Sequence, residues 1–182
     1  DSVAVDIGYL DGDGLGDILA ATQRHSHLSI FQNLWGYMFR SPTYYSHHPS
    51  DPLDMELGDF DGDGDLDIAI LADDPQTLNI YQNDGTGGLS LTQQAVARAS
   101  YFDFADLEGD GDLDMFLGGY GGFTLIYTND GAGNFSIADS LIDTGTFTLG
   151  DGDGDGDLDL FFARFAETGF IWHRNDGTGV FD

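Results

Sequence analysis

The stretch Gly58-Asp-Phe-Asp-Gly-Asp-Gly-Asp-Leu-Asp-Ile68 decides the fold, because three other segments of the 182-residue chain repeat its pattern. These segments are residues 8–18, 105–115 and 150–160, and equivalent positions in successive repeats are 50, 47 and 45 residues apart. A fixed period of this size indicates an architecture in which each repeat is one supersecondary unit.

A second landmark, an asparagine, follows each acidic loop at a nearly constant distance. Counted from the first loop position, the distances are 24, 24, 23 and 24 residues, and the asparagines are Asn33, Asn83, Asn129 and Asn175. In the last three repeats the asparagine begins Asn-Asp-Gly, which supplies the positive-φ residues of a tight hairpin turn. Two landmarks at locked spacing indicate a true repeat.

The hydrophobic pattern around the landmarks predicts β-strands. Apolar residues alternate before each loop, as in Val3, Val5 and Ile7, which is the period of a half-buried strand. Compact apolar runs follow each loop, a third strand leads into the asparagine, and a fourth starts at Leu89 or Phe135. No ten-residue stretch has a convincing helical period.

Four strands per repeat of roughly 45 residues is the size of a propeller blade. The sequence therefore predicts an all-β fold of propeller-type blades, with four repeats of about four antiparallel strands each. We expect one repeat domain, 1–182, with repeats at 3–52, 53–99, 100–145 and 146–182.

The last repeat reaches only Val180-Phe-Asp182 after its turn and is expected to lack most of its outer strand. This predicts a partial propeller or an assembly completed by an oligomer. Either the remaining blades lie beyond Asp182, or another copy supplies the contacts, and head-to-tail copies that do not close would form a filament. Because the chain opens without Met or a signal peptide, we expect a processed or excised segment.

Acidic residues occupy alternate positions of each nine-residue loop, the arrangement that a hard cation such as Ca²⁺ prefers. Glycines at positions 4 and 6 would let the backbone curl with positive φ. The predicted ligands are Asp11, Asp13 and Asp17; Asp59, Asp61, Asp63, Asp65 and Asp67; Asp106, Glu108, Asp110, Asp112 and Asp114; and Asp151, Asp153, Asp155, Asp157 and Asp159. Asp65, at position 7, is expected to donate its backbone carbonyl.

We expect three to four Ca²⁺ ions, with the first loop weakest because Tyr9 replaces an aspartate. The loops are not EF-hands, because strands flank them and Ile70 stands at position 12. The alternative is an Asp-Gly turn that holds a hairpin without metal. It is disfavoured because four carboxylates close together would repel one another and raise their own pKa values.

Charge and composition exclude several function classes. The chain has 33 acidic and 5 basic residues and a net charge of −28, which argues against nucleic acid or an anionic membrane as partner. The loops hold 18 of the 33 acids, three in the first and five in each other loop, whereas a halophilic surface would spread them out. Four Ca²⁺ ions would bring the net charge from −28 only to −20, so a halophilic surface stays an alternative. The chain has no Cys and no apolar run long enough to span a bilayer.

The Asp-x-Asp-Gly-Asp-Gly-x-x-Asp loop, with Tyr-x-Asn-Asp-Gly-x-Gly-x-Phe downstream, resembles the FG-GAP/VCBS repeats found in integrin α-subunits, some lectins and secreted bacterial proteins. The resemblance covers essentially the whole chain. It implies that the loop acids are Ca²⁺ ligands, and that the protein is extracellular, secreted or at the cell surface, and serves adhesion or glycan binding. Such propellers usually have more than four blades, and Tyr9 and Gly16 depart from the loop pattern.

Other candidate sites carry weaker signals. His25 and His27 lie two apart and would suit a transition metal on one strand face, whereas His47-His48 fits plain loop chemistry. Asn134-Phe-Ser136 is the only N-glycosylation sequon. A final group of aromatic residues would form either a sugar-stacking platform or ordinary strand packing: Trp35, Tyr37, Tyr44 and Tyr45.

No nucleophile–base pair or phosphate loop appears, so we expect no enzyme activity. Two functions stay open. One is an extracellular Ca²⁺-binding module for adhesion or for glycan or protein binding, and the other is a self-assembling subunit of an extracellular filament or coat.

Overall fold

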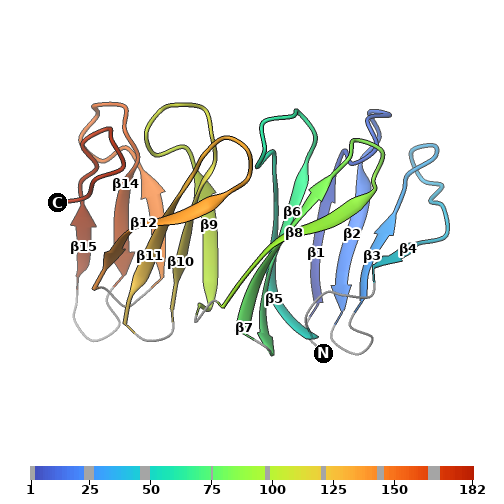
Figure 1. Cartoon of the computed structure of the whole chain (residues 1–182), viewed down its shortest axis with the longest axis horizontal. Helices are drawn as coiled ribbons and strands as arrows, with labels where there is room; N and C mark the ends of the chain where they lie inside the picture. Colours follow the sequence, from blue (N-terminus) through green and yellow to red (C-terminus); the bar gives the residue numbers. More distant parts are fainter. Residues whose placement is uncertain are drawn as a thin grey trace. The chain divides into compact units, whose positions relative to one another are not determined.

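The computed structural model describes residues 3–22, 27–45, 50–74, 76–96, 99–119, 122–142, 146–163 and 169–182. All regular elements in these ranges are β-strands (Figure 1). The strands are β1 (Val3–Gly8), β2 (Asp17–Thr22), β3 (His27–Phe31), β4 (Thr43–Tyr45), β5 (Ser50–Gly58), β6 (Asp67–Asp74), β7 (Gln76–Asn83), β8 (Leu89–Val96), β9 (Tyr101–Ala105), β10 (Asp114–Gly118), β11 (Thr124–Asn129), β12 (Phe135–Leu141), β13 (Phe147–Gly150), β14 (Asp159–Ala163) and β15 (Phe170–His173).

The strands form four antiparallel sheets, each built from consecutive strands, which we call blades 1 to 4. Blade 1 is β1-β2-β3-β4, blade 2 is β5-β6-β7-β8, blade 3 is β9-β10-β11-β12 and blade 4 is β13-β14-β15. Each sheet corresponds to one sequence repeat, and the fourth strands of blades 2 and 3 begin at Leu89 and Phe135. The predicted all-β fold of propeller-type blades is confirmed.

The chain divides into two compact units, Asp1–Ala97 and Arg98–Asp182. Each unit contains two blades and its own hydrophobic core. The core of the first unit joins residues of blade 1, such as Leu19, to residues of blade 2, such as Ile68. The core of the second unit likewise joins Phe116 of blade 3 to Phe162 of blade 4. The single domain expected from the sequence stays a prediction.

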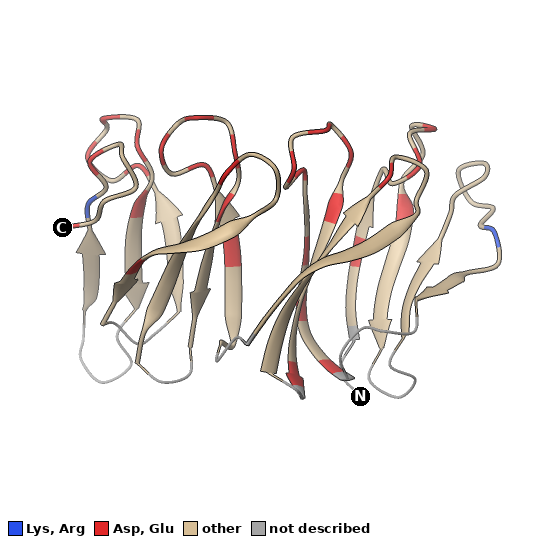
Figure 2. Ribbon diagram, in the orientation of Figure 1, with Lys and Arg blue, Asp and Glu red and all other residues tan. Residues whose placement is uncertain are grey.

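The acidic loops all occupy the same place in their blades, the connection from the first strand to the second. Figure 2 shows aspartate and glutamate gathered in these connections. The residue before each loop pairs with the loop's ninth residue, as in Gly58 with Asp67, so the first two strands close every loop at its base. The described residues include no helix long and apolar enough to cross a membrane.

Candidate metal centre

Glycines at positions 4 and 6 give the loops their tight curl. In the second loop Gly62 has φ 72° and Gly64 has φ 93°, and the paired glycines of the other three loops also have positive φ. Side chains other than glycine rarely adopt this region. The predicted role of these glycines is confirmed.

The ninth position is a buried aspartate that ties three parts of the blade together. Asp67 is fully buried. Its Oδ2 accepts a hydrogen bond from the amide of Phe60 at 3.0 Å, and its Oδ1 accepts one from the amide of Asn83 at 2.9 Å. Asp17, Asp114 and Asp159 make the same two bonds in their own blades. This aspartate therefore fixes the loop to the hairpin that carries the landmark asparagine.

Positions 1, 3 and 5 hold the loop through contacts between side chains and backbone amides. In the second loop Asp59 Oδ2 accepts a bond from the amide of Gly64 at 3.0 Å, and Asp63 Oδ1 accepts one from the amide of Asp65 at 2.9 Å. In the third loop Asp106 accepts bonds from three backbone amides. Each of these bonds leaves carboxylate lone pairs for another ligand.

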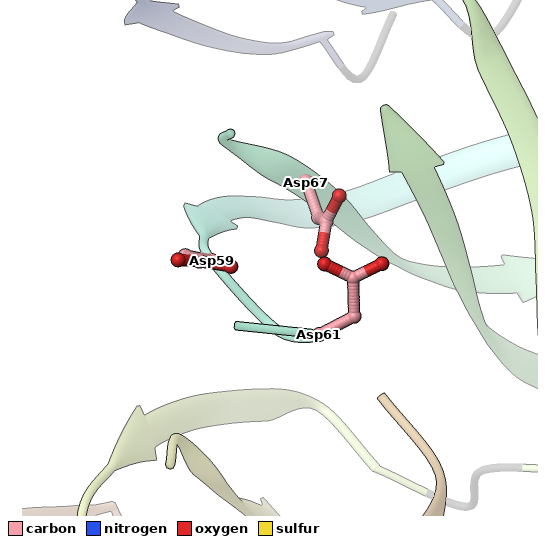
Figure 3. A group of neighbouring side chains, drawn as sticks. All are labelled: Asp59, Asp61 and Asp67. Atoms are coloured by element: carbon pink, nitrogen blue, oxygen red, sulfur yellow. The ribbon is translucent and has the colours of Figure 1, made fainter. Parts of the chain in front are cut away.

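Carboxylates of positions 1, 3 and 9 converge in the second and fourth loops. One oxygen from each of Asp59, Asp61 and Asp67 lies within 4.8 Å of the others, and Figure 3 shows Asp61 and Asp67 pointing toward one another. Asp151, Asp153 and Asp159 form the same group in the fourth loop. Among the described residues, the carboxylates of the first and third loops do not meet at this separation.

The electrostatics of these groups fit a bound cation. Burial first, and then the charges of Asp61 and Asp63, raise the pKa of Asp67 to about 6. Burial, followed by repulsion from neighbouring loop acids, also raises the pKa of Asp61 and of Glu108. Asp59 Oδ1 is buried without a hydrogen-bond partner in the described structure. An oxygen-rich donor set with a buried, unpartnered carboxylate oxygen suits Ca²⁺, which prefers oxygen ligands.

The seventh-position carboxylates lie away from this converging group. A Cβ atom added to Gly131 would lie 2.6 Å from Asp112 Oδ2, and one added to Gly177 would lie 2.6 Å from Asp157 Oδ2. Asp65 occupies the same place against Gly85. The side chain of position 7 therefore covers the glycine of the Asn-Asp-Gly turn, and its backbone carbonyl stays the predicted ligand atom.

The first loop departs from the others at three linked places. Position 1 is Tyr9, 62% exposed, position 7 is Leu15, and Leu34-Trp35 replaces Asp-Gly after Asn33. The loop therefore lacks both the position-1 carboxylate and the aspartate–glycine contact of the other repeats.

We predict that Tyr9→Asp strengthens Ca²⁺ binding at the first loop by roughly 10-fold, because ligand charge tunes the affinity of such sites. Site-resolved titration of wild type, Tyr9→Asp and the control Tyr9→Phe would measure this. Among the wild-type loops, the first should bind Ca²⁺ most weakly. The third loop should still bind Ca²⁺, with a geometry altered by Glu108 at position 3. A first loop as tight as the second would contradict the ranking.

Arg174 is a cation already placed at the fourth loop. Its Nε donates to Asp153 Oδ2 at 2.5 Å and its Nη2 donates to Asp155 Oδ2 at 2.8 Å. The guanidinium hydrogen bond lowers the pKa of Asp155. In the first loop the residue at the same repeat position, Gln32, donates to Asp11 Oδ2 at 3.1 Å. The side chain before the landmark asparagine thus reaches position 3 of the loop in both repeats.

We predict that Arg174→Gln tightens Ca²⁺ binding at the fourth loop only modestly, by less than about 5-fold, since an exposed ion pair contributes little and is screened by solvent. Calorimetric titration of the variant beside wild type measures the change. Arg40→Gln is a matched control, because Arg40 donates to Gln32 Oε1 and not to a loop carboxylate. Unchanged or weaker binding in Arg174→Gln would show that the guanidinium does not compete with the metal.

The structure separates the aromatic residues that the sequence grouped. Trp35 and Tyr37 lie in the turn after β3 and are 80% and 88% exposed. Tyr45 instead donates to the carbonyl of Gly87 at 2.8 Å and packs against the core of the first unit. Tyr44 lies 5.6 Å from the ring of His27. Of these four aromatic residues, only Trp35 and Tyr37 therefore lie together in the exposed hairpin after β3.

The remaining candidates have simple surroundings. Asn134 is exposed and its Nδ2 donates to Asp130 Oδ2 at 3.0 Å, and its glycosylation stays a prediction. His25 and the pair His47-His48 lie outside the described residues, so the expected His25–His27 metal pair stays a prediction as well.

Comparison with known proteins agrees with this geometry. The FG-GAP-like repeat family matches three overlapping segments, residues 10–70, 59–117 and 106–162. The chain is an all-β repeat protein of propeller-type architecture, and it belongs to the FG-GAP-like repeat family. No curated protein matches it.

One similar solved structure is that of an Agrocybe aegerita lectin, described as recognising non-reducing terminal N-acetylglucosamine. The TM-score is 0.66 at 21% sequence identity, and the match covers 97% of this chain and 49% of the lectin chain. The likeness shows a shared propeller-type fold. The chain spans about half the length of that lectin.

Proposed function

We propose that the chain is an extracellular, non-catalytic FG-GAP module that binds Ca²⁺ through its acidic loops and uses an exposed hairpin to bind glycans. The converging carboxylates of the second loop carry the proposal, because Asp59, Asp61 and Asp67 approach within 4.8 Å without a basic partner among the contacts described. Such grouping is unfavourable unless a cation offsets the repulsion.

The role assigned to Ca²⁺ is structural. When bound, the ion would supply positive charge to carboxylates of positions 1, 3, 5 and 9. Those residues already hold the loop in shape through bonds to its own amides, as Asp59 does with Gly64. The ion would therefore add stability to a preformed loop that joins the first two strands of each blade. Millimolar extracellular Ca²⁺ suits the weak affinity typical of extracellular modules.

Glycan binding is assigned to the hairpin that contains Trp35 and Tyr37. Both rings are largely exposed, and an exposed apolar patch can mark a ligand-binding surface. Aromatic rings with a polar group combine a flat apolar surface with a hydrogen-bond donor. The similar lectin recognises terminal N-acetylglucosamine, so glycans ending in that sugar are the first probe.

The experiment is a glycan array in Ca²⁺, followed by titration of the strongest glycan. We expect Trp35→Ala and Tyr37→Ala each to weaken binding about 5- to 30-fold, the effect of losing roughly 1–2 kcal/mol of aromatic contact. Phe123→Ala is the control, because Phe123 is 50% exposed but lies in blade 3, before β11. Loss of affinity in the control alone, or no glycan bound by wild type, would refute this assignment.

A further inference from the structure

Two exposed sheet surfaces carry residues at the same register positions as the residues that form the buried blade–blade interfaces inside the units. We call the surface of blade 1 that carries Val5 and Ile7 the preceding face, and the surface of blade 4 that carries Phe161, Phe170 and Trp172 the following face. Val5 is 60% exposed, Ile7 65%, Phe170 69% and Trp172 42%. The internal interfaces show what such faces bind.

In the first unit, blade 2 binds blade 1 through its own preceding face. Leu57 of that face approaches the following face of blade 1 closely, since a Cβ added to Gly8 would lie 2.5 Å from Leu57 Cδ1. Asn83 Nδ2 donates to the carbonyl of Leu10 in blade 1 at 2.8 Å. Leu19 and Ile68, from the two faces, belong to one buried core.

The second unit repeats this interface. Asn175 Nδ2 of blade 4 donates to the carbonyl of Leu107 in blade 3 at 3.0 Å. Phe116 of blade 3 and Phe162 of blade 4 share the core of this unit. One apolar contact and one asparagine–carbonyl bond therefore join successive blades in both units.

The preceding face of blade 1 carries the equivalents of these contact residues, but Ile7 is exposed and Asn33 lacks the interblade bond. By strand register Ile7 is the equivalent of Leu57, as Ile7 pairs with Ile18 and Leu57 with Ile68. Asn33, the equivalent of Asn83, bonds through Nδ2 to the carbonyl of Gly16 in its own blade, at 3.1 Å. Asn83 and Asn175 each make that bond and the interblade bond as well. Asn33 Oδ1 is buried without a partner, whereas Oδ1 of Asn83 and of Asn175 accepts bonds from glycine amides of its own turn, so this oxygen reports the altered turn of blade 1 and not its open face.

A cavity also opens on the preceding face of blade 1. It has a volume of about 420 Å³ and is lined by Thr22, His27, Ser29 and Tyr44. The equivalents of Ser29 and His27 in blade 2 are Asn79 and Thr77, since each pair shares its register position. Asn79 and Thr77 are buried, so the corresponding region of blade 2 is covered.

The following face of blade 4 supplies the complementary half. Phe161, Phe170 and Trp172 are the register equivalents of Leu19, Leu28 and Ile30, which are at most 2% exposed in blade 1. The rings of Phe161 and Trp172 stack at 5.8 Å with an interplanar angle of 14°. Gly150 is the equivalent of Gly8, and a Cβ added to it would meet no atom within 4 Å.

We propose that the following face of blade 4 binds the preceding face of blade 1 in a second copy of this chain, in the register of the internal interfaces. In that register Ile7 of one copy packs on Gly150 of the other. Asn33 donates its second Nδ2 hydrogen to the carbonyl of Gly152, the equivalent of Leu10 and Leu107. Phe170 faces the cavity beside Ser29, where it removes its exposed ring from water. The contact is head to tail.

The test is light scattering of the 182-residue chain over a range of concentrations, in about 0.15 M salt so that repulsion between acidic copies is screened beyond about 8 Å. We expect wild type to form dimers or larger assemblies. Gly150→Val should weaken association about 10- to 100-fold by overfilling the contact. In a single chain the added methyl groups extend from a Cβ in open space, so its folding should be unaffected. Ile7→Asp should weaken association at least as strongly, because the contact would bury an unpaired carboxylate.

Mixing the two variants tests the head-to-tail direction. Gly150→Val keeps an intact blade 1 and Ile7→Asp keeps an intact blade 4, so the mixture should form a heterodimer while each variant alone stays monomeric. Ile137→Asp, at a site that is 62% exposed on β12, is the control and should assemble like wild type. A wild-type chain that remains monomeric at all concentrations would overturn the proposal. So would association that both variants leave unchanged.

Discussion

Removal of divalent cations should lower the melting temperature of the chain by about 10 to 30 °C. The expectation follows from the second, third and fourth loops, each of which has acidic residues at positions 1, 3, 5 and 9. Burial first, and then repulsion from Asp63 and Asp59, raise the pKa of Asp61, so the second loop of the folded chain retains unfavourable charge without metal. A ligand that binds only the folded state stabilises it by mass action.

The magnitude comes from three sites of ordinary extracellular affinity. With a Kd of about 10⁻⁴–10⁻³ M, a Ca²⁺ concentration of about 10 mM contributes roughly 1.4–2.7 kcal/mol per site. Three sites together contribute about 4–8 kcal/mol. One kcal/mol shifts the melting temperature of a domain of this size by about 2–4 °C.

Differential scanning calorimetry in Ca²⁺ and in excess chelator measures the shift. Mg²⁺ at equal concentration is the control, because Mg²⁺ demands near-ideal octahedral geometry and gives up water reluctantly. It should restore little of the lost stability. Identical melting curves in Ca²⁺ and chelator would show that the loops are hairpin turns without a structural ion.

The strands and the loop backbone could be predicted from the sequence because both depend on local patterns. Alternating apolar residues such as Val5 and Ile7 predict β1, and the glycine pairs of the loops predict the positive φ observed at Gly62 and Gly64. Hydrophobic period and glycine content act over a few residues. No knowledge of the tertiary structure was needed for either.

The functions of positions 7 and 9 could not be predicted from their residue type, because their contacts are distant in the chain. From its residue type Asp67 is only one more candidate ligand, and its bond to the amide of Asn83, 16 residues away, adds a structural role that the residue type does not show. The constant spacing between loop and asparagine was the available signal for that bond. Similarly, Asp occurs at position 7 only in repeats with Asn-Asp-Gly, whereas Leu15 accompanies Trp35.

The blade interfaces were also beyond sequence reasoning. Leu19 and Phe161 occupy equivalent positions, and both are apolar, so the pattern assigns both to a core. The structure distinguishes them by their neighbours, since Leu19 is fully buried in the first unit and Phe161 stacks on the exposed Trp172. Apolar residues at these positions predict that a blade face is suited to packing, but they do not identify the surface against which it packs.

The aspartate at loop position 9 should be required for stability even without metal, whereas the aspartate at loop position 3 should contribute to stability only when metal is bound. We expect Asp67→Ala to reduce the free energy of unfolding by about 2–6 kcal/mol in chelator, because two buried backbone amides lose their acceptor at about 1–3 kcal/mol each. Asp61→Ala removes a single bond of 3.3 Å from the amide of Asp63 and relieves repulsion, so its effect in chelator should stay within about 1 kcal/mol.

Urea unfolding of both variants, with and without Ca²⁺, separates the two functions. In Ca²⁺, Asp61→Ala should lose the roughly 1.4–2.7 kcal/mol that its site contributes, and Asp67→Ala should lose that amount in addition to its chelator effect. Asp114→Ala provides the same test in the second unit, since Asp114 accepts bonds from the amides of Leu107 and Asn129 at 3.0 and 2.9 Å. Equal losses for Asp61→Ala and Asp67→Ala in chelator would contradict this division, because they would mean that the two amide bonds add nothing to stability.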